Sequence, residues 1–145
     1  NGFPCLIVRE HPKPSERAIL YFFGGGMVIG PDKGDLPVMR KLCRDTGCDV
    51  WFPFYPLCME HCITETYDMV YECYRRMIEL YGGGNVSTCG FSSGGALPDF
   101  EAACKRANVP YTAFARPKMV HCYCMLPVFR EAKEDFAKIA EILKQ

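Results

Sequence analysis

The stretch that decides how this chain is interpreted is Asn85-Val86-Ser87-Thr88-Cys89-Gly90-Phe91-Ser92-Ser93-Gly94-Gly95. Its first half favours a β-strand, and residues 90–94 follow with the pattern G-x-S-x-G. That pattern is typical of a sharp strand-to-helix turn, which holds the central serine in a strained conformation with its hydroxyl exposed. The two glycines of the pattern are small because the turn brings backbone segments close together. We therefore predict a strand over 86–89 that ends at an exposed Ser92 hydroxyl.

The composition bounds the fold and excludes several classes of partner. The 145 residues fit one domain, and a hydrophobic content of 49% is enough for a buried core. Lys+Arg and Asp+Glu are both 17, so the net charge favours neither nucleic acid nor an anionic membrane. The longest apolar run, residues 18–23, is far too short to span a bilayer. We expect a single domain over residues 1–145, located in the cytoplasm, with no membrane span and no nucleic-acid partner.

The chain has 10 cysteines, an unusually high number for its length. Neither close pair, Cys58 with Cys62 or Cys122 with Cys124, has the second pair and the histidines that a zinc site needs. The others are Cys5, Cys43, Cys48, Cys73, Cys89 and Cys104. Free cysteine is among the most buried residue types, and disulfides are rare in the cytosol. We therefore expect reduced, mostly buried thiols, no metal site and no cofactor.

Apolar periodicity predicts that strands and helices alternate along the chain. Strands are predicted over residues 3–9, 18–23, 49–54, 86–89 and 111–115. Helices are predicted over residues 35–47, 64–81, 100–108 and 128–144. The run at 18–23 is continuously apolar, as expected of a strand covered on both faces of a parallel sheet. The alternation indicates an α/β domain with a mostly parallel sheet and helices on both faces.

Two of these helices carry predictions about their ends and faces. We expect Asp35 to cap the first helix and Gly47 to end it. We expect Thr64 to cap the second helix. The buried stripe of the second helix is predicted to be Tyr67, Val70, Tyr71, Tyr74, Met77, Ile78 and Tyr81.

Four segments, taken in order, resemble a known family. Residues 22–30, with glycines at 24–26, resemble an HGGG loop, and residues 55–61 resemble a Y-R-L-A-P-E-H segment. Residues 90–95 match a nucleophile elbow with a trailing glycine, and residues 117–121 resemble a histidine segment before a closing helix. The chain is therefore similar to the α/β-hydrolase superfamily, in particular to its hormone-sensitive-lipase-like esterases. The resemblance implies an α/β-hydrolase sheet, shortened between the elbow and the histidine segment.

The resemblance also implies roles for particular residues. Ser92 would attack an ester carbonyl and form an acyl-enzyme, and His121 would act as the general base. The oxyanion hole would consist of the backbone N–H groups of Gly24, Gly25, Gly26 and Ser93. The implied activity is a carboxylic-ester hydrolase, and the implied partner is a small-molecule ester with a small or medium acyl group.

The acid of the expected triad is the weakest part of this resemblance. The family order is serine, acid, histidine, but Asp99 and Glu101 are the only acids between elbow and histidine segment. Asp99 is the nearest candidate for the acid. Pro98 would interrupt a helix that continued from the elbow, at a cost of about 3 kcal/mol. Residues 96–98 therefore resemble a join at which part of the domain, including the acid, is absent.

A shortened sheet has further consequences. We expect the strand over 111–115 to be separated from the strand over 86–89 by a gap as wide as the missing strands. An uncovered edge strand and its apolar surface favour a homo-oligomer. A smaller departure from the family is Phe23, which stands where the family usually has histidine.

Two alternatives to an active serine esterase stay open. The first is a catalytically impaired hydrolase-like domain that keeps the sheet and the elbow but lacks the triad acid. The second is a thiol enzyme that uses Cys89 or Cys122, although neither lies in a recognisable nucleophile turn. Peptidase, lactonase and deacetylase reactions use the same machinery as an esterase, so the sequence does not select among them.

Overall fold

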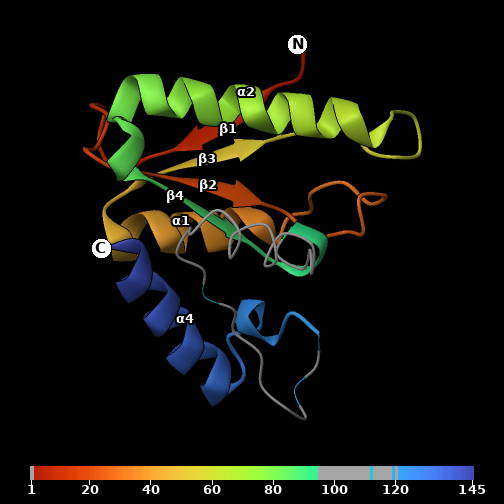
Figure 1. The fold of residues 1–145 in the computed structure, drawn as a ribbon. Coiled ribbons are helices and arrows are strands. Elements are labelled where there is room, and N and C mark those ends of the chain that lie inside the picture. The colour runs from red at the N-terminus through yellow and green to blue at the C-terminus, as the bar shows by residue number, and fades with distance from the viewer. Residues whose placement is uncertain (1, 95–111, 113–118, 120) are drawn as a thin grey trace.

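A four-stranded sheet forms the centre of the protein (Figure 1), which was analysed as a computed structural model describing residues 2–94, 112, 119 and 121–145. The strands are β1 (Cys5–Val8), β2 (Ala18–Phe22), β3 (Asp49–Pro53) and β4 (Val86–Gly90). Their order in the sheet is β1-β3-β2-β4. Strand β2 is parallel to both β3 and β4, whereas β1 is antiparallel to β3 at the edge. The prediction of an α/β fold with a mostly parallel sheet is confirmed.

Helices cover both faces of this sheet. Helix α2 (Ile63–Tyr81) lies on one face, and helices α1 (Asp35–Thr46) and α4 (Arg130–Leu143) lie on the other (Figure 1). Three short 3₁₀ turns are η1 (Gly83–Asn85), η2 (Ser92–Gly94) and η3 (Tyr123–Met125). The predicted helix over 100–108 and most of the predicted strand over 111–115 lie outside the described residues. None of the helices in the described ranges combines the length and the apolar character needed to cross a bilayer.

The two central strands supply most of the core. All five residues of β3 are buried, as are the first four of β2. The rings of Tyr21 and Phe52, on these two strands, lie 5.5 Å apart. Burial on both faces explains why β2 is continuously apolar and why β3 is apolar after Asp49. Because β2 and β4 are parallel, with Phe22 opposite Gly90, the loops after these two strands emerge side by side.

The first helix ends as predicted but begins differently. Gly47 has φ +73°, and its N–H donates to the carbonyl of Cys43 at 2.8 Å, so it ends α1 as expected. The N-cap is Gly34, not Asp35. The buried carboxylate of Asp35 accepts the Tyr21 hydroxyl at 3.0 Å, because it faces the sheet. Asp35 therefore joins α1 to β2.

The predicted buried stripe of α2 is partly wrong. The helix begins at Ile63, with Cys62 as its N-cap, and Tyr67 and Tyr71 are 53% and 63% exposed. The buried residues are Thr66, Met69, Cys73, Met77 and Tyr81. The Thr66 hydroxyl donates to the carbonyl of Pro56 at 2.7 Å, which turns this side of the helix towards the sheet. The buried face of α2 therefore includes a polar side chain whose hydroxyl is satisfied by the segment after β3.

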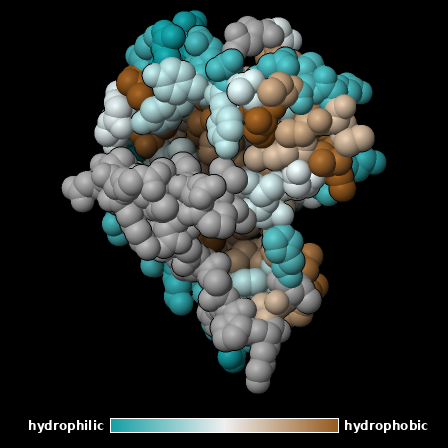
Figure 2. Space-filling model, turned by 45° about the vertical axis from the view of Figure 1, so that its right-hand side comes forward, coloured by the Kyte–Doolittle hydropathy of each residue, from teal (hydrophilic) through white to brown (hydrophobic). Residues whose placement is uncertain are grey.

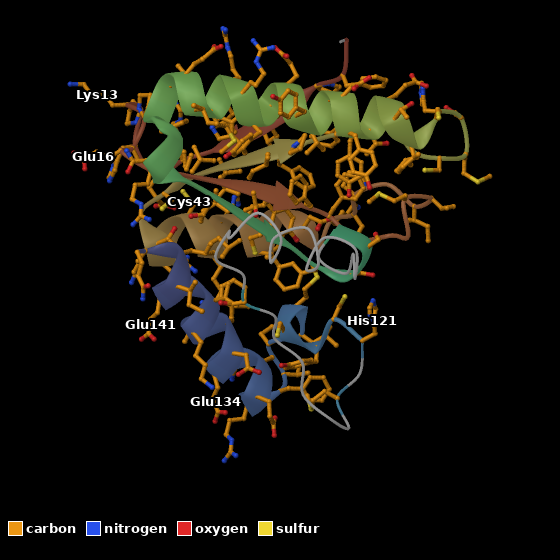
Figure 3. The ribbon with its side chains drawn as sticks, in the orientation of Figure 1. Lys13, Glu16, Cys43, His121, Glu134 and Glu141 are labelled. Atoms are coloured by element: carbon orange, nitrogen blue, oxygen red, sulfur yellow. The ribbon has the colours of Figure 1, made fainter. Side chains whose placement is uncertain are left out.

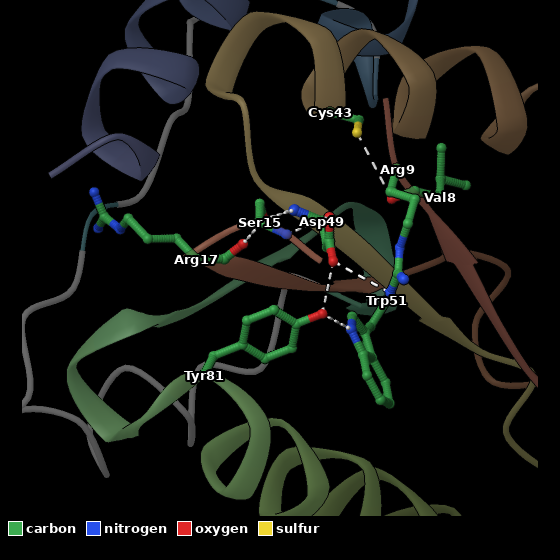
Figure 4. Close-up of polar contacts among 8 residues, drawn as sticks. All are labelled: Val8, Arg9, Ser15, Arg17, Cys43, Asp49, Trp51 and Tyr81. Atoms are coloured by element: carbon green, nitrogen blue, oxygen red, sulfur yellow. Dashed lines mark hydrogen bonds and ion pairs between the residues drawn. The ribbon is translucent and has the colours of Figure 1, made fainter. Parts of the chain in front are cut away.

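A buried polar cluster surrounds Asp49 at the amino end of β3 (Figure 4). The Tyr81 hydroxyl donates to the Asp49 carboxylate at 2.7 Å and accepts the indole N–H of Trp51 at 3.1 Å. The Arg9 guanidinium lies 3.2 Å from the same carboxylate. The Ser15 hydroxyl accepts the Asp49 backbone N–H at 2.9 Å. These contacts offset the cost of burying the Asp49 charge and join α2 to β3 and to the loop after β1.

The cysteines differ from the expectation in their burial. Every cysteine in the described ranges is a free thiol. Cys43, Cys48 and Cys73 are buried, but Cys58 and Cys62 are exposed and the others are intermediate. The prediction of mostly buried thiols is therefore wrong, because the segment before α2 and the segment before η3 carry cysteines near the surface. Cys104 lies outside the described residues.

Candidate active site

Ser92 lies at the carboxyl end of β4, where the chain turns sharply into η2. Its φ is +55°, a left-handed conformation that costs a residue with a side chain roughly 1–2 kcal/mol. The preceding N–H, of Phe91, donates to the carbonyl of Phe22 at 3.3 Å and so continues the pairing of β4 with β2. The predicted strained conformation of Ser92 is confirmed, and the sheet is what maintains it.

The glycine loop after β2 packs directly against Ser92. A Cβ atom placed on Gly24 would lie 3.0 Å from Ser92 Cβ and 3.7 Å from its Oγ. Only a residue without a side chain lets the loop backbone approach the serine this closely. The predicted oxyanion loop and the predicted nucleophile are therefore neighbours.

The loop then folds into a tight turn centred on Gly25. Its φ is +108°, and its carbonyl accepts the N–H groups of Val28 at 3.1 Å and Ile29 at 2.9 Å. A Cβ atom on Gly25 would lie 2.2 Å from the Ile29 carbonyl oxygen. Gly25 is thus required by the shape of the loop itself.

The predicted oxyanion donors differ in their hydrogen bonding. The N–H of Gly26 donates to Oγ of Ser93 at 2.9 Å, so it is already engaged. Within the described ranges, no acceptor is recorded for the N–H groups of Gly24 and Gly25. Among the described residues, two of the three loop amides therefore have no hydrogen-bond acceptor.

The segment that follows β3 holds the glycine loop in place through hydrogen bonds and ring stacking. The buried Tyr55 hydroxyl donates to the carbonyl of Phe23 at 2.7 Å, and the two rings stack with centroids 4.0 Å apart. The N–H of Cys58 donates to the carbonyl of Met27 at 2.8 Å. Sequence reasoning matched this segment to a family pattern but missed the role of the Tyr55 hydroxyl. Stacking on Tyr55 also accounts for an aromatic residue at position 23.

His121 reaches the serine from the other end of the chain. Its Nε2 lies 2.7 Å from Ser92 Oγ, and the side chain projects from the segment before η3 towards the elbow (Figure 3). Among the described residues, no carboxylate contacts the second ring nitrogen of His121, Nδ1. The predicted acid, Asp99, and its neighbour Glu101 lie outside those ranges. The structure thus brings together Ser92, His121 and the glycine loop.

The remaining predicted nucleophiles and ligands are less favourable. Burial, and secondarily the nearby Cys124, raise the pKa of the Cys89 thiol to about 12, so it is protonated at neutral pH. This counts against Cys89 as the nucleophile of a thiol enzyme. Among the residues that the structure describes, no group of three or more His, Cys, Asp and Glu side chains could hold a metal ion.

Comparisons with known proteins show which family the fold belongs to. The model of the alpha/beta hydrolase fold family matches residues 19–137. A hormone-sensitive lipase from a metagenome library is 25% identical, with a TM-score of 0.60 over 75% of this chain and 37% of its own. An esterase from Pyrobaculum calidifontis is 15% identical, with a TM-score of 0.80 over 98% of this chain and 81% of its own.

A third similar structure is that of EstE5 soaked with p-nitrophenyl butyrate. It is 15% identical, with a TM-score of 0.80 over 99% of this chain and 81% of its own. A search of curated proteins found no match. The chain spans only 37% of the length of the hormone-sensitive lipase, so it corresponds to a part of that protein.

Proposed function

Because the chain belongs to the α/β-hydrolase fold family, with hormone-sensitive-lipase-like esterases among its structural relatives, we propose that it hydrolyses carboxylic esters through Ser92 and His121. The observation that carries the proposal is the 2.7 Å separation of His121 Nε2 and Ser92 Oγ. That distance is within the range needed for proton transfer from a serine to its general base. The strained φ of Ser92 and the adjacent glycine loop support the same assignment.

In the first half-reaction, His121 Nε2 accepts the hydroxyl proton as Ser92 Oγ bonds to the ester carbonyl carbon. The N–H groups of Gly24, Gly25 and Ser93 would stabilise the negative oxygen that results. The bond to the alcohol oxygen then breaks, and the imidazolium returns its proton to that oxygen. The alcohol leaves, and the acyl group remains on Ser92.

In the second half-reaction, water takes the place of the alcohol. His121 Nε2 accepts a proton from water as the water oxygen bonds to the acyl carbon. Collapse of the second intermediate breaks the bond to Ser92 Oγ, which recovers its proton from the imidazolium. The carboxylic acid leaves, and the enzyme returns to its starting state.

Apolar side chains beside the glycine loop support an ester with apolar groups. Val28, Ile29 and Met59 are 47%, 68% and 72% exposed, and the hydrogen bond from Cys58 to Met27 holds their two loops together. Figure 2 brings the right-hand side of Figure 1 forward and shows apolar residues on the surface there. EstE5 was soaked with an ester of a four-carbon acid. These observations favour small or medium acyl esters as the substrate class.

The alternative is a catalytically impaired hydrolase-like domain. The observation that favours it is that no carboxylate among the described residues contacts His121 Nδ1. An enzyme of this type that loses only its acid is expected to retain the nucleophile and to lose about 10⁴-fold in turnover. Both proposals keep Ser92 in its turn, but they predict different rates of ester turnover.

Labelling with a fluorophosphonate and turnover of p-nitrophenyl butyrate test the proposal together. Stoichiometric labelling that is lost in Ser92→Ala, with turnover that is lost in both Ser92→Ala and His121→Ala, would support the esterase. Labelling with turnover close to that of Ser92→Ala would favour the impaired domain. A folded protein that is not labelled at Ser92 would contradict the assignment of the nucleophile. Ser87→Ala, in the same strand, is the matched control for the serine substitution.

A further inference from the structure

A third buried tyrosine–aspartate pair, after those of Tyr21 with Asp35 and Tyr81 with Asp49, begins two residues after His121. The hydroxyl of Tyr123, two residues after the histidine, donates to a carboxylate oxygen of Asp135 in α4. Both side chains are buried, with exposed fractions of 6% and 3%. The hydrogen bond crosses from η3 to the closing helix, so it connects the segment that bears His121 to α4.

The path from His121 to this bond is short and tightly folded. Cys122 has φ +57°, and its carbonyl accepts the N–H of Met125 at 3.0 Å. The carbonyl of Tyr123 accepts the N–H of Leu126 at 2.9 Å. Only Cys122 separates Tyr123 from His121, and its backbone is constrained by this turn. A displacement of Tyr123 is therefore expected to move the His121 backbone as well.

Helix α4 provides a fixed support for this connection. Its buried face consists of Ala132, Asp135, Phe136, Ala140 and Leu143. The ammonium of Lys41, in α1, lies 4.5 Å from the centre of the Phe136 ring. At the end of the helix, the Arg17 guanidinium donates to the carbonyl of Lys144. Contacts at both the middle and the end of α4 join it to the body of the domain.

We infer that the hydrogen bond between Tyr123 and Asp135 positions the His121 imidazole against Ser92 Oγ. This inference rests on the proposed function, because it assigns both side chains as positioning residues for that reaction. No carboxylate among the described residues contacts His121, and the Tyr123 hydrogen bond acts on the backbone that carries this ring. Misplacing a reacting group by about 1 Å can cost ~10²-fold in rate.

The protonation state of Tyr123 is compatible with its hydrogen bond to Asp135. Burial, and then the hydrogen bond to Asp135, raise the pKa of Tyr123, so its hydroxyl stays protonated and donates. The Lys138 ammonium lies 3.5 Å from the other carboxylate oxygen of Asp135. The Tyr123 hydroxyl therefore remains a hydrogen-bond donor to Asp135 at neutral pH.

The chain offers a matched control for this inference. Tyr81 donates a similar buried hydrogen bond to Asp49, but at the amino ends of the parallel strands, away from Ser92. Tyr123→Phe and Tyr81→Phe therefore delete the same chemical group. We expect both to lower the thermal midpoint, and only Tyr123→Phe to lower kcat, by ~10- to 100-fold, with KM unchanged. Equal kcat values in the two variants would overturn the inference.

A second substitution separates alignment from general loss of packing. Asp135→Asn keeps an oxygen that can accept the Tyr123 hydroxyl, so it should retain most of the activity that Asp135→Ala loses. Equal losses in the two Asp135 variants would contradict a role for the hydrogen bond.

A readout that does not require turnover separates this inference from the proposed function. In protein labelled with ¹⁵N-histidine, the Nε2 resonance of His121, assigned with His121→Asn, reports its hydrogen bond to Ser92. We expect Tyr123→Phe to shift this resonance and Tyr81→Phe to leave it unchanged. No shift in Tyr123→Phe would overturn the positioning role. A shift in a protein that fails to react with fluorophosphonate would support the positioning role and contradict the proposed function.

Discussion

The backbone N–H of Gly26 donates a hydrogen bond to Oγ of Ser93 at 2.9 Å. This contact joins the glycine loop to the residue that follows the candidate nucleophile. It fixes the two parts of the proposed oxyanion hole relative to each other, but it also engages one of the amides expected to stabilise the oxyanion.

Ser93→Ala should therefore raise kcat for p-nitrophenyl butyrate. Without the hydroxyl, the Gly26 N–H is free to contribute to the oxyanion hole. The gain should be smaller than the ~10²-fold that one oxyanion donor is worth, because the bond to Ser93 can already open when substrate binds. Ser87→Ala serves as the control. A fall in kcat would contradict this expectation. It would show that the hydrogen bond contributes more by holding the glycine loop in place than it costs by engaging the Gly26 N–H.

Gly25 and Gly26 form a second test, because both have positive φ, of +108° and +66°, but only Gly25 is crowded. Gly26→Ala should cost roughly 1–2 kcal/mol of backbone strain and leave much of the activity. Gly25→Ala and the bulkier Gly25→Val should abolish turnover, because the new Cβ would lie 2.2 Å from the Ile29 carbonyl oxygen and open the turn. Unfolding by urea and p-nitrophenyl acetate turnover measure both effects. An unchanged rate in Gly25→Val would contradict the loop assignment.

Phe23→His, which restores the residue usual in the family, should destabilise this protein. Position 23 is 1% exposed and stacks on Tyr55, so an imidazole there would bury a polar ring among aromatic side chains. We expect the free energy of unfolding to fall by about 1–3 kcal/mol. Phe23→Leu is the control, since it loses the stacking but adds no polar atom. A histidine variant more stable than the leucine variant would show that a hydrogen-bond partner exists there.

Cys62 gives the protein a specific dependence on pH. Hydrogen bonds from the Thr64 hydroxyl, and then from its backbone N–H, lower the pKa of the Cys62 thiol in the folded state. Folding therefore favours the thiolate. The resulting stabilisation is complete above the unfolded pKa of about 8.5 and is lost as the pH falls through the folded pKa.

The free energy of unfolding, measured with urea under reducing conditions between about pH 6.5 and 9.5, should therefore rise more steeply with pH in the wild type than in Cys62→Ser. Serine can accept the same N–H groups but does not titrate in this range. Parallel pH profiles in the two proteins would contradict the assignment.

The sequence predicted the parts of the fold that depend on local patterns. The continuous apolar run at β2, the glycine that ends α1 and the G-x-S-x-G turn each have one physical interpretation, and the structure agrees with it. The face of α2 could not be predicted in the same way. Apolar spacing favoured Tyr67 and Tyr71, whereas the inward hydrogen bond of Thr66 depends on a segment elsewhere in the chain.

The candidate site was predictable as a set of residues but not as a geometry. The motifs identified Ser92, His121 and the three glycines. No sequence pattern indicates that Ser93 engages the Gly26 amide, because that contact depends on the distance between two loops. No pattern indicates the Tyr123 contact with Asp135 either, since a tyrosine after a histidine segment has no pattern of its own. The acid stays a prediction, because Asp99 lies outside the described residues.

The Asp49 cluster, at the amino ends of the parallel strands, has a practical consequence for protein engineering. The cluster (Figure 4) supports the domain at the end of the sheet opposite to the one where Ser92 emerges, so it lies away from the proposed reacting groups. Selection for heat resistance could therefore act on residues around Asp49 without disturbing the reacting groups. The same separation allows the end of the sheet near Ser92 to be redesigned for new acyl groups while the contacts around Asp49 keep the chain folded.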